Sequence, residues 1–133
     1  MKKYKLKNGK IITKKDMLII LDWCKKRLGR SKFFSIRKLK LRINTKTNFL
    51  GLFDVEKNTI HVNPNVQSDL ITLIETIIHE YVHFKQNPKE YDRLCRNNSF
   101  KYYFDHPHEE EAEKIALSLG KICFFELKKN KMI

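Results

Sequence analysis

The stretch SDLITLIETIIHEYVHFKQ, residues 68–86, decides the fold because it predicts a long helix that also carries the chain's most distinctive motif. Ser68 or Asp69 is a suitable cap for its first turn. Pro88 cannot continue a helix and therefore marks its end. The motif HEYVH, residues 79–83, lies in the second half of this helix.

The two sides of this helix differ in polarity. Its apolar side consists of Ile74, Ile77, Ile78 and Tyr81. The side that holds His79 and His83 also holds Thr72, Glu75 and Thr76. We therefore expect the two histidines to face a cleft, which argues against a pair of hydrogen-bonded histidines inside the core.

HEYVH has the spacing of a metal site. Residues four apart on a helix lie on one face, one turn apart, so the imidazoles of His79 and His83 can reach a single ion. Glu80 lies about 100° round the helix from His79, where it can hold a zinc-bound water without binding the metal itself. The sequence predicts one Zn²⁺ at this place.

Strand patterns and a first helix precede this stretch. Thr13 can cap a helix that runs to about Leu28, where Gly29 stops it. Residues 1–12 are rich in lysine and predict a small hairpin or a loose arm around the turn Asn8-Gly9. Three strands are then expected, at residues 39–43, 49–55 and 59–63, with a turn at 56–58 and Pro64 after the last.

Two more helices are expected after the motif. The first runs from about Pro88 to Arg96, and the second from about Pro107 to Lys128. An aromatic loop, residues 100–104, connects them. Because no repeat or linker divides the chain, we expect residues 1–133 to form one α+β domain.

The chain is strongly basic, with a formal net charge of +13 from 28 basic and 15 acidic residues. Such an excess makes a nucleic-acid partner possible. However, 22 of the basic residues are lysine and 6 are arginine, the better residue for bidentate phosphate and base contacts. Abundant Lys, Asn and Ile are also typical of a genome biased toward A and T, which is the plainer explanation of the charge.

Cysteines and the N-terminus bear on the compartment. Cys24, Cys95 and Cys123 are far apart and form no CxxC pair, so they predict neither a disulfide framework nor a thiolate zinc site. No apolar segment follows the basic N-terminus, so neither a signal peptide nor a membrane span is expected. Both features favour a cytoplasmic protein.

A third metal ligand is needed, because catalytic zinc takes three protein ligands and one open position. The candidates lie in the acidic run that begins the last expected helix: Glu109, Glu110 and Glu111. Acidic residues in a first helical turn also complement the helix dipole and need no metal. That explanation does not account for His106 and His108 beside them.

With this acidic run, the chain resembles the gluzincins, zinc peptidases with two His ligands and one Glu ligand. Its size is similar to minigluzincins, and the segments around Thr59–Asn63 and Glu109–Glu113 are similar to the ImmA/IrrE-like and SprT-like groups, some of them encoded by phages. The resemblance implies a zincin-like fold, in which a short, mostly antiparallel sheet packs on the active-site helix and a C-terminal helix carries the third ligand. In the pattern Glu-x-x-Ala-Asp/Asn this ligand is Glu109. Glu113 then takes the Asp/Asn position, which usually supports a ligand histidine.

The implied activity is peptide hydrolysis, with Glu80 as the general base. The tetrahedral oxyanion needs a second stabiliser, for which the candidates are Tyr91, Tyr102, Tyr103, His106 and His108. We prefer His106, because it precedes the ligand helix at its cap. The strand at 59–62 is expected to form the cleft's edge and to pair with an extended peptide. His61 on that strand is expected to be a surface residue.

Two other functions fit the same sequence. The chain can be a zincin-fold binding module that grips DNA or a partner protein with little turnover. Alternatively, the metal site can be purely structural. Glu80 argues against a structural site, which has no use for a carboxylate beside the metal.

Overall fold

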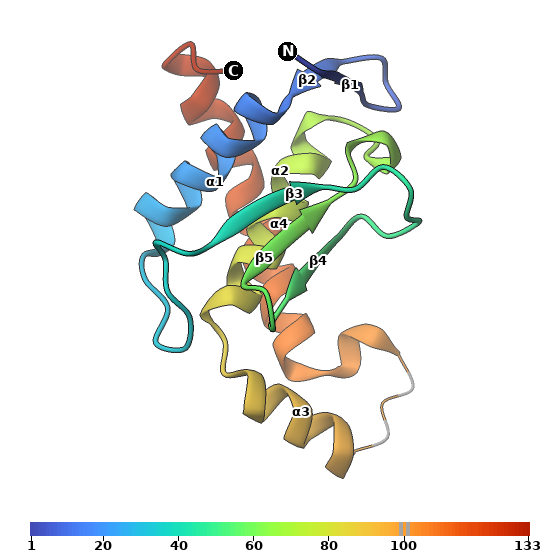
Figure 1. Cartoon of the computed structure of the whole chain (residues 1–133), viewed down its shortest axis with the longest axis vertical. Helices are drawn as coiled ribbons and strands as arrows, with labels where there is room; N and C mark the ends of the chain where they lie inside the picture. Colours follow the sequence, from blue (N-terminus) through green and yellow to red (C-terminus); the bar gives the residue numbers. More distant parts are fainter. Residues whose placement is uncertain (99, 101) are drawn as a thin grey trace.

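A computed structural model describes residues 1–98, 100 and 102–133, and its architecture is α+β, as predicted (Figure 1). Lys101, part of the predicted aromatic loop, lies outside the described residues. Within the described part of the chain, no helix is both long and apolar enough to cross a membrane.

The strands form two separate sheets. β1 (Lys3–Lys5) and β2 (Ile11–Thr13) are the hairpin expected near the N-terminus. Gly9 makes its turn with a φ of 93°, a conformation that glycine adopts without strain. The second sheet has the order β3-β5-β4 and is formed by β3 (Lys40–Ile43), β4 (Gly51–Asp54) and β5 (Thr59–Val62).

The three-stranded sheet is mixed. β5 pairs in parallel with β3 and antiparallel with β4, so both of its edges are occupied. The expectation that residues 59–62 would offer an edge to a peptide is therefore wrong. The free edges belong to β3 and β4, because a strand in the centre of a sheet has no backbone groups left to pair.

The helices follow the expected boundaries within two residues. Thr13 caps the first one in a reciprocal capping box with Asp16, and Asp69 caps the one that carries HEYVH. The α-helices are α1 (Lys14–Leu28), α2 (Leu70–Lys85), α3 (Pro88–Asn97) and α4 (Pro107–Lys129). Two short 3₁₀ helices are η1 (Pro64–Val66) and η2 (Tyr103–Asp105).

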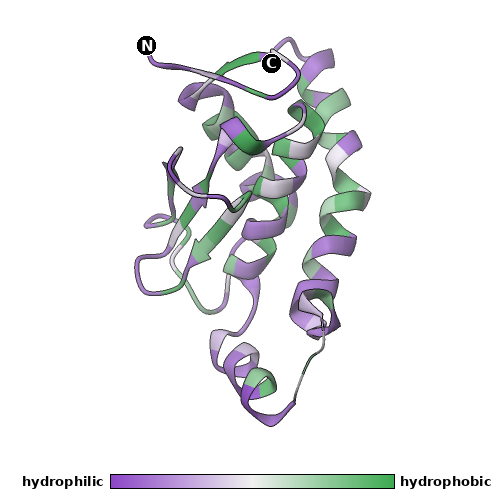
Figure 2. Ribbon diagram, turned by 90° about the vertical axis from the view of Figure 1, so that its right-hand side faces the viewer, coloured by the Kyte–Doolittle hydropathy of each residue, from purple (hydrophilic) through white to green (hydrophobic). Residues whose placement is uncertain are grey.

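α2 is the centre of the molecule: it packs against the sheet, α1 and α4. Its apolar side is fully buried, including Ile74, Ile77, Ile78 and Tyr81, as the polarity pattern predicted. Gly120 lets α4 lie close to α2, since a Cβ there would come within 2.5 Å of Cγ of Glu75. In Figure 2, hydrophobic residues run along the strands and the long helices, whereas α3 is mostly hydrophilic and contributes no buried residue.

Candidate metal centre

Three side chains from two helices converge on one point. His79 and His83 come from α2, and Glu109 comes from the first turn of α4. Oε1 of Glu109 lies 3.1 Å from Nε2 of His79 and 2.8 Å from Nε2 of His83. One ligand atom from each residue lies within 4.8 Å of the others, so this group can hold a metal ion.

The local sequence explains this convergence. The i, i+4 spacing places the two imidazoles on one face of α2, with 5.0 Å between their ring centroids. Pro107 starts α4, and Glu109 follows in a first turn where the helix dipole favours a carboxylate. The close packing of α4 on α2 buries Glu109, whose exposed fraction is 3%.

A second side chain contacts each histidine at Nδ1, the ring nitrogen that faces away from Glu109. Nδ1 of His79 lies 3.3 Å from Oε2 of Glu113, and Nδ1 of His83 lies 2.6 Å from Oε1 of Gln86. These contacts fix both rings with Nε2 toward Glu109. The longer Glu side chain at position 113 thus still reaches His79.

The chemistry of these contacts fits a cation. If each Nδ1–H donates to Glu113 or Gln86, the Nε2 of a neutral ring carries a lone pair that faces the carboxylate of Glu109. Two kinds of hydrogen-bond acceptor, the Nε2 atoms and Oε1 of Glu109, then face each other. This arrangement is stable only if the imidazoles are protonated or if a positive ion lies between them. Two imidazole nitrogens and one carboxylate oxygen, each supported by an outer hydrogen bond, are a donor set suited to zinc.

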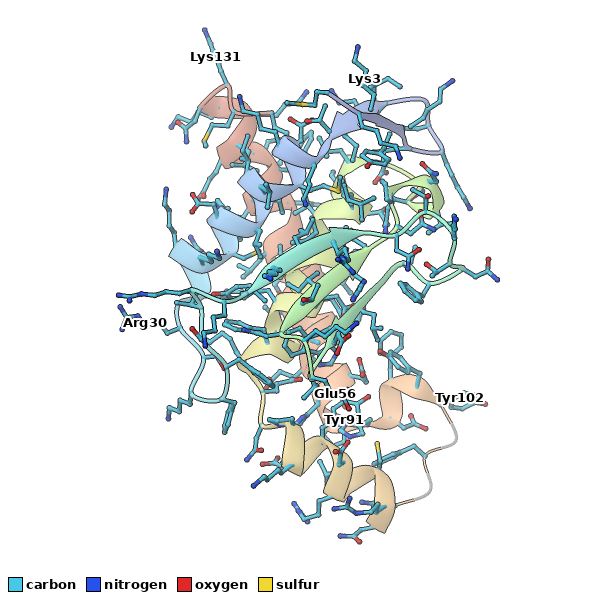
Figure 3. All side chains as sticks on the ribbon, in the orientation of Figure 1. Lys3, Arg30, Glu56, Tyr91, Tyr102 and Lys131 are labelled. Carbon is cyan, nitrogen blue, oxygen red and sulfur yellow. The ribbon has the colours of Figure 1, made fainter. Side chains whose placement is uncertain are left out.

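Tyr91, labelled in Figure 3, completes the support of Glu109 from α3. Its hydroxyl donates to Oε2 of Glu109 at 2.5 Å, which leaves Oε1 to face the histidines. Burial raises the pKa of Glu109, but hydrogen bonds from His79, His83 and Tyr91 outweigh it and hold that pKa well below the ordinary value. Burial lowers the pKa of His83, but its hydrogen bonds to Glu109 and Gln86, together with the negative charges of Glu109 and Glu80, raise that pKa above its ordinary value.

The two rival carboxylates point elsewhere. Glu110 is half-exposed and pairs with Lys114 at 2.9 Å. Glu111 accepts a hydrogen bond from Nε2 of Gln86 at 3.0 Å. Of the three consecutive acids, Glu109 is the one that the structure brings to the histidines.

Glu80 lies beside this group but makes none of its contacts. It is buried, with an exposed fraction of 7%. Burial raises its pKa, while the nearby His79 and His83 and a hydrogen bond from the backbone of Phe53 lower it. Gly51 of β4 allows this closeness, since a Cβ there would lie 3.3 Å from Oε2 of Glu80 and 2.7 Å from Cγ2 of Thr76.

Two cavities, of about 340 and 300 Å³, flank Glu80. Both are lined by Gly51, Glu80 and Tyr103, so these residues separate them. His79 lines the first cavity, and His83 lines the second together with Glu109. A chain that passes along β4 would therefore have one cavity on each side of Glu80.

His106, the residue preferred as oxyanion stabiliser, is used otherwise. Its Nδ1 accepts the backbone N–H of His108 as the cap of α4, and its Nε2–H donates to the backbone oxygen of Tyr91 at 3.0 Å. The ring also stacks on Tyr91, with 3.9 Å between centroids. Both nitrogens are thus engaged with backbone groups and the ring is buried, which does not favour His106 as the oxyanion stabiliser; its contacts position Tyr91 instead.

The other candidates for the oxyanion stabiliser differ in whether they line the cavities beside Glu80. Tyr103 lines both cavities, and burial and a hydrogen bond to Glu109 raise its pKa. Tyr102 is as exposed as Tyr103, 62% against 61%, but it lines neither cavity. Nε2 of His108 pairs with Glu90 at 3.1 Å. His61 lies on the sheet, 3.8 Å from Asp54, apart from the histidines of α2.

Sequence reasoning missed two supports of the centre. Gln86 was seen only as the end of a helix, although its place three residues after His83 puts it on the same face. Tyr91 was considered only as an oxyanion stabiliser, and nothing in its sequence context points to Glu109.

Known proteins add no further constraint. A scan against protein-family models finds no match for this chain, and searches of curated proteins and of solved structures find none either. What the centre can do therefore follows from its own donors: two imidazole nitrogens and a carboxylate oxygen that can hold a metal ion, with a buried carboxylate beside them.

Proposed function

We propose that this chain is a zinc-dependent peptidase of gluzincin type, with His79, His83 and Glu109 as metal ligands. The observation that carries the proposal is the buried carboxylate of Glu80, placed beside the ligand group and between two cavities. A structural metal site is closed and needs neither. The N,N,O donor set favours zinc over the all-oxygen shells of magnesium and calcium.

When bound, the metal ion supplies Lewis-acid activation of water and of the scissile carbonyl. Glu80 takes the proton of the attacking water and passes it to the leaving amine. Its raised pKa suits this double role, because a group that both takes and returns a proton works best when its pKa lies nearer to the working pH. Glu113 and Gln86 keep the two imidazoles in place while the charge in the cleft changes.

The oxyanion stabiliser in this proposal is Tyr103. It lines both cavities next to Glu80, and its raised pKa keeps the phenol protonated, so the hydroxyl can donate. It belongs to η2, directly before α4, so packing of the α4 N-terminus on α2 brings it to the centre.

The substrate in this proposal is an extended peptide that pairs with β4. This strand is an edge of the sheet, and Gly51, Leu52 and Phe53 all line cavities at the centre. An added strand offers its backbone to β4 and its alternate side chains to the cavities. The scissile carbonyl then lies near Glu80.

The test compares the buried carboxylate of Glu80 with the exposed carboxylate of Glu110. Glu80→Gln removes the base, and Glu110→Gln removes an exposed carboxylate that pairs only with Lys114. For each variant we measure the rate of cleavage of a fluorescence-quenched peptide mixture and, separately, the zinc content of the protein. We expect Glu80→Gln to keep its zinc and to lose roughly 10²–10⁴-fold in rate, while Glu110→Gln keeps both. Equal cleavage by Glu80→Gln and the parent would show that Glu80 is not the base.

A further inference from the structure

A basic groove lies away from the metal centre, between α1 and the β3 side of the sheet. Its volume is about 740 Å³, more than twice that of either cavity beside Glu80. In Figure 1, α1 lies next to the sheet on the side of β3. Leucines of α1 and β3 line the groove, together with five cationic side chains: Lys14, Lys25, Lys40, Arg42 and Lys57.

The charges of the groove are not neutralised within the protein. Among the described residues, none of these five cations forms an ion pair, and none of the residues that line the groove is acidic. The two acids of α1 have other partners: Asp16 accepts from Thr13 in the helix cap, and Asp22 pairs with Lys26. Five like charges around one hollow repel each other, and an anionic ligand would relieve that repulsion.

The spacing of the cations suits a long anion. Lys14 and Lys25 are eleven residues apart on α1, about 16 Å along the helix axis. Lys40 and Arg42 lie two residues apart on one face of β3, about 7 Å from each other. A single phosphate or carboxylate cannot contact groups spread this far, whereas about five base-pair steps of a duplex cover 16 Å.

We propose that this groove binds the phosphate backbone of a nucleic-acid duplex without reading its sequence. Four of the five cations are lysines, which contact phosphates as point charges, and one is an arginine. No Phe, Tyr or Trp is among the described residues that line the groove, so it lacks the stacking surfaces that single strands need. Four leucines, Leu18, Leu21, Leu39 and Leu41, form the apolar part of its lining.

The groove and the metal centre lie toward opposite edges of the same sheet. The groove is lined by β3 and its neighbour β5, whereas Gly51 at the metal centre belongs to β4. A duplex in the groove therefore leaves the β4 edge free. The inference does not depend on whether Glu80 cleaves peptides.

The test uses matched sets of exposed lysines in the full chain. The first variant replaces Lys14, Lys40 and Lys57 by glutamine, which removes three charges of the groove. The control replaces Lys89, Lys121 and Lys129 of α3 and α4, which removes three charges elsewhere. Fluorescence anisotropy measures binding to a 20-base-pair DNA duplex of mixed sequence between 50 and 200 mM salt, and circular dichroism checks the fold.

We expect the groove variant to bind the duplex roughly tenfold more weakly or worse at moderate salt. The slope of log K against log salt should fall by about 2.7, since each lost phosphate contact contributes about 0.9. The control should keep affinity and slope close to the parent's. Equal losses in both variants, no binding by the parent, or tighter binding of a single strand would overturn the proposal. Displacement of the duplex by polyglutamate at equal charge would assign the groove to an acidic peptide instead.

Discussion

Tyr91→Phe tests the support of the metal centre by removing one oxygen atom. The phenyl ring can keep its stacking on His106, 3.9 Å between centroids, so the shape of the site should persist. What disappears is the hydroxyl that donates to Oε2 of Glu109 at 2.5 Å. Hydrogen bonds to charged groups contribute about 1.5–3 kcal/mol, which corresponds to roughly 10- to 150-fold in a dissociation constant. Outer hydrogen bonds at metal sites typically change affinity by about 10- to 100-fold, within the same range.

The assay is competition for zinc with a chromophoric chelator at fixed pH. Tyr81→Phe is the matched control, because it removes the same atom from a tyrosine whose hydroxyl donates to the backbone oxygen of Gly29, also at 2.5 Å. We expect Tyr81→Phe to lower the melting temperature and leave zinc affinity unchanged, whereas Tyr91→Phe weakens zinc binding by at least about tenfold. Zinc affinity of Tyr91→Phe within twofold of the parent would refute the role given to Tyr91.

Two further outcomes are expected. Gly51→Ala should lower the free energy of unfolding by about 1–3 kcal/mol and reduce peptide cleavage, because the added Cβ meets Cγ2 of Thr76 at 2.7 Å. In Gly120→Ala the added Cβ meets only the flexible side chain of Glu75, so thermal unfolding should show a smaller loss of stability. Metal-free protein should be most stable to urea between about pH 4.5 and 6.5. The lowered pKa of Glu109 stabilises the fold above its ordinary 4.5 and is lost in acid, and the raised pKa of His83 stabilises it below 6.5 and is lost as pH rises. A stability that climbs steadily from pH 6 to 8 would contradict this.

Local signals were enough to place the helices. Asp69 and Pro88 bracket α2, and Pro107 begins α4, because caps and prolines act on the residues next to them. The polarity of α2 also predicted correctly which side is buried, since that follows from helical spacing alone.

The order of the strands could not be read in the same way. β5 lies between β3 and β4 in the sheet, because residues 59–62 pair directly with residues 40–43 although β4 comes between them in the sequence. No local pattern records that pairing. The edge strand was therefore misplaced, although each strand was expected near its observed position.

The choice among Glu109, Glu110 and Glu111 also depended on tertiary structure. Consecutive residues point about 100° apart around a helix, so only the rotation of α4 on α2 decides which one meets the histidines. The resemblance to gluzincins indicated Glu109 by pattern, and the distances to Nε2 of His79 and His83 agree. His106 was correctly placed at the cap of α4, but its ring turns toward Tyr91.

The metal content of the purified protein tests the central claim most directly. We expect the parent to hold one zinc ion per chain after dialysis, and Glu110→Ala to hold the same amount. His79→Ala and Glu109→Ala should lose it, because each removes a donor atom from a three-residue set. A folded parent that binds no zinc, or a Glu109→Ala variant that keeps its zinc as Glu110→Ala does, would contradict the metal centre described above.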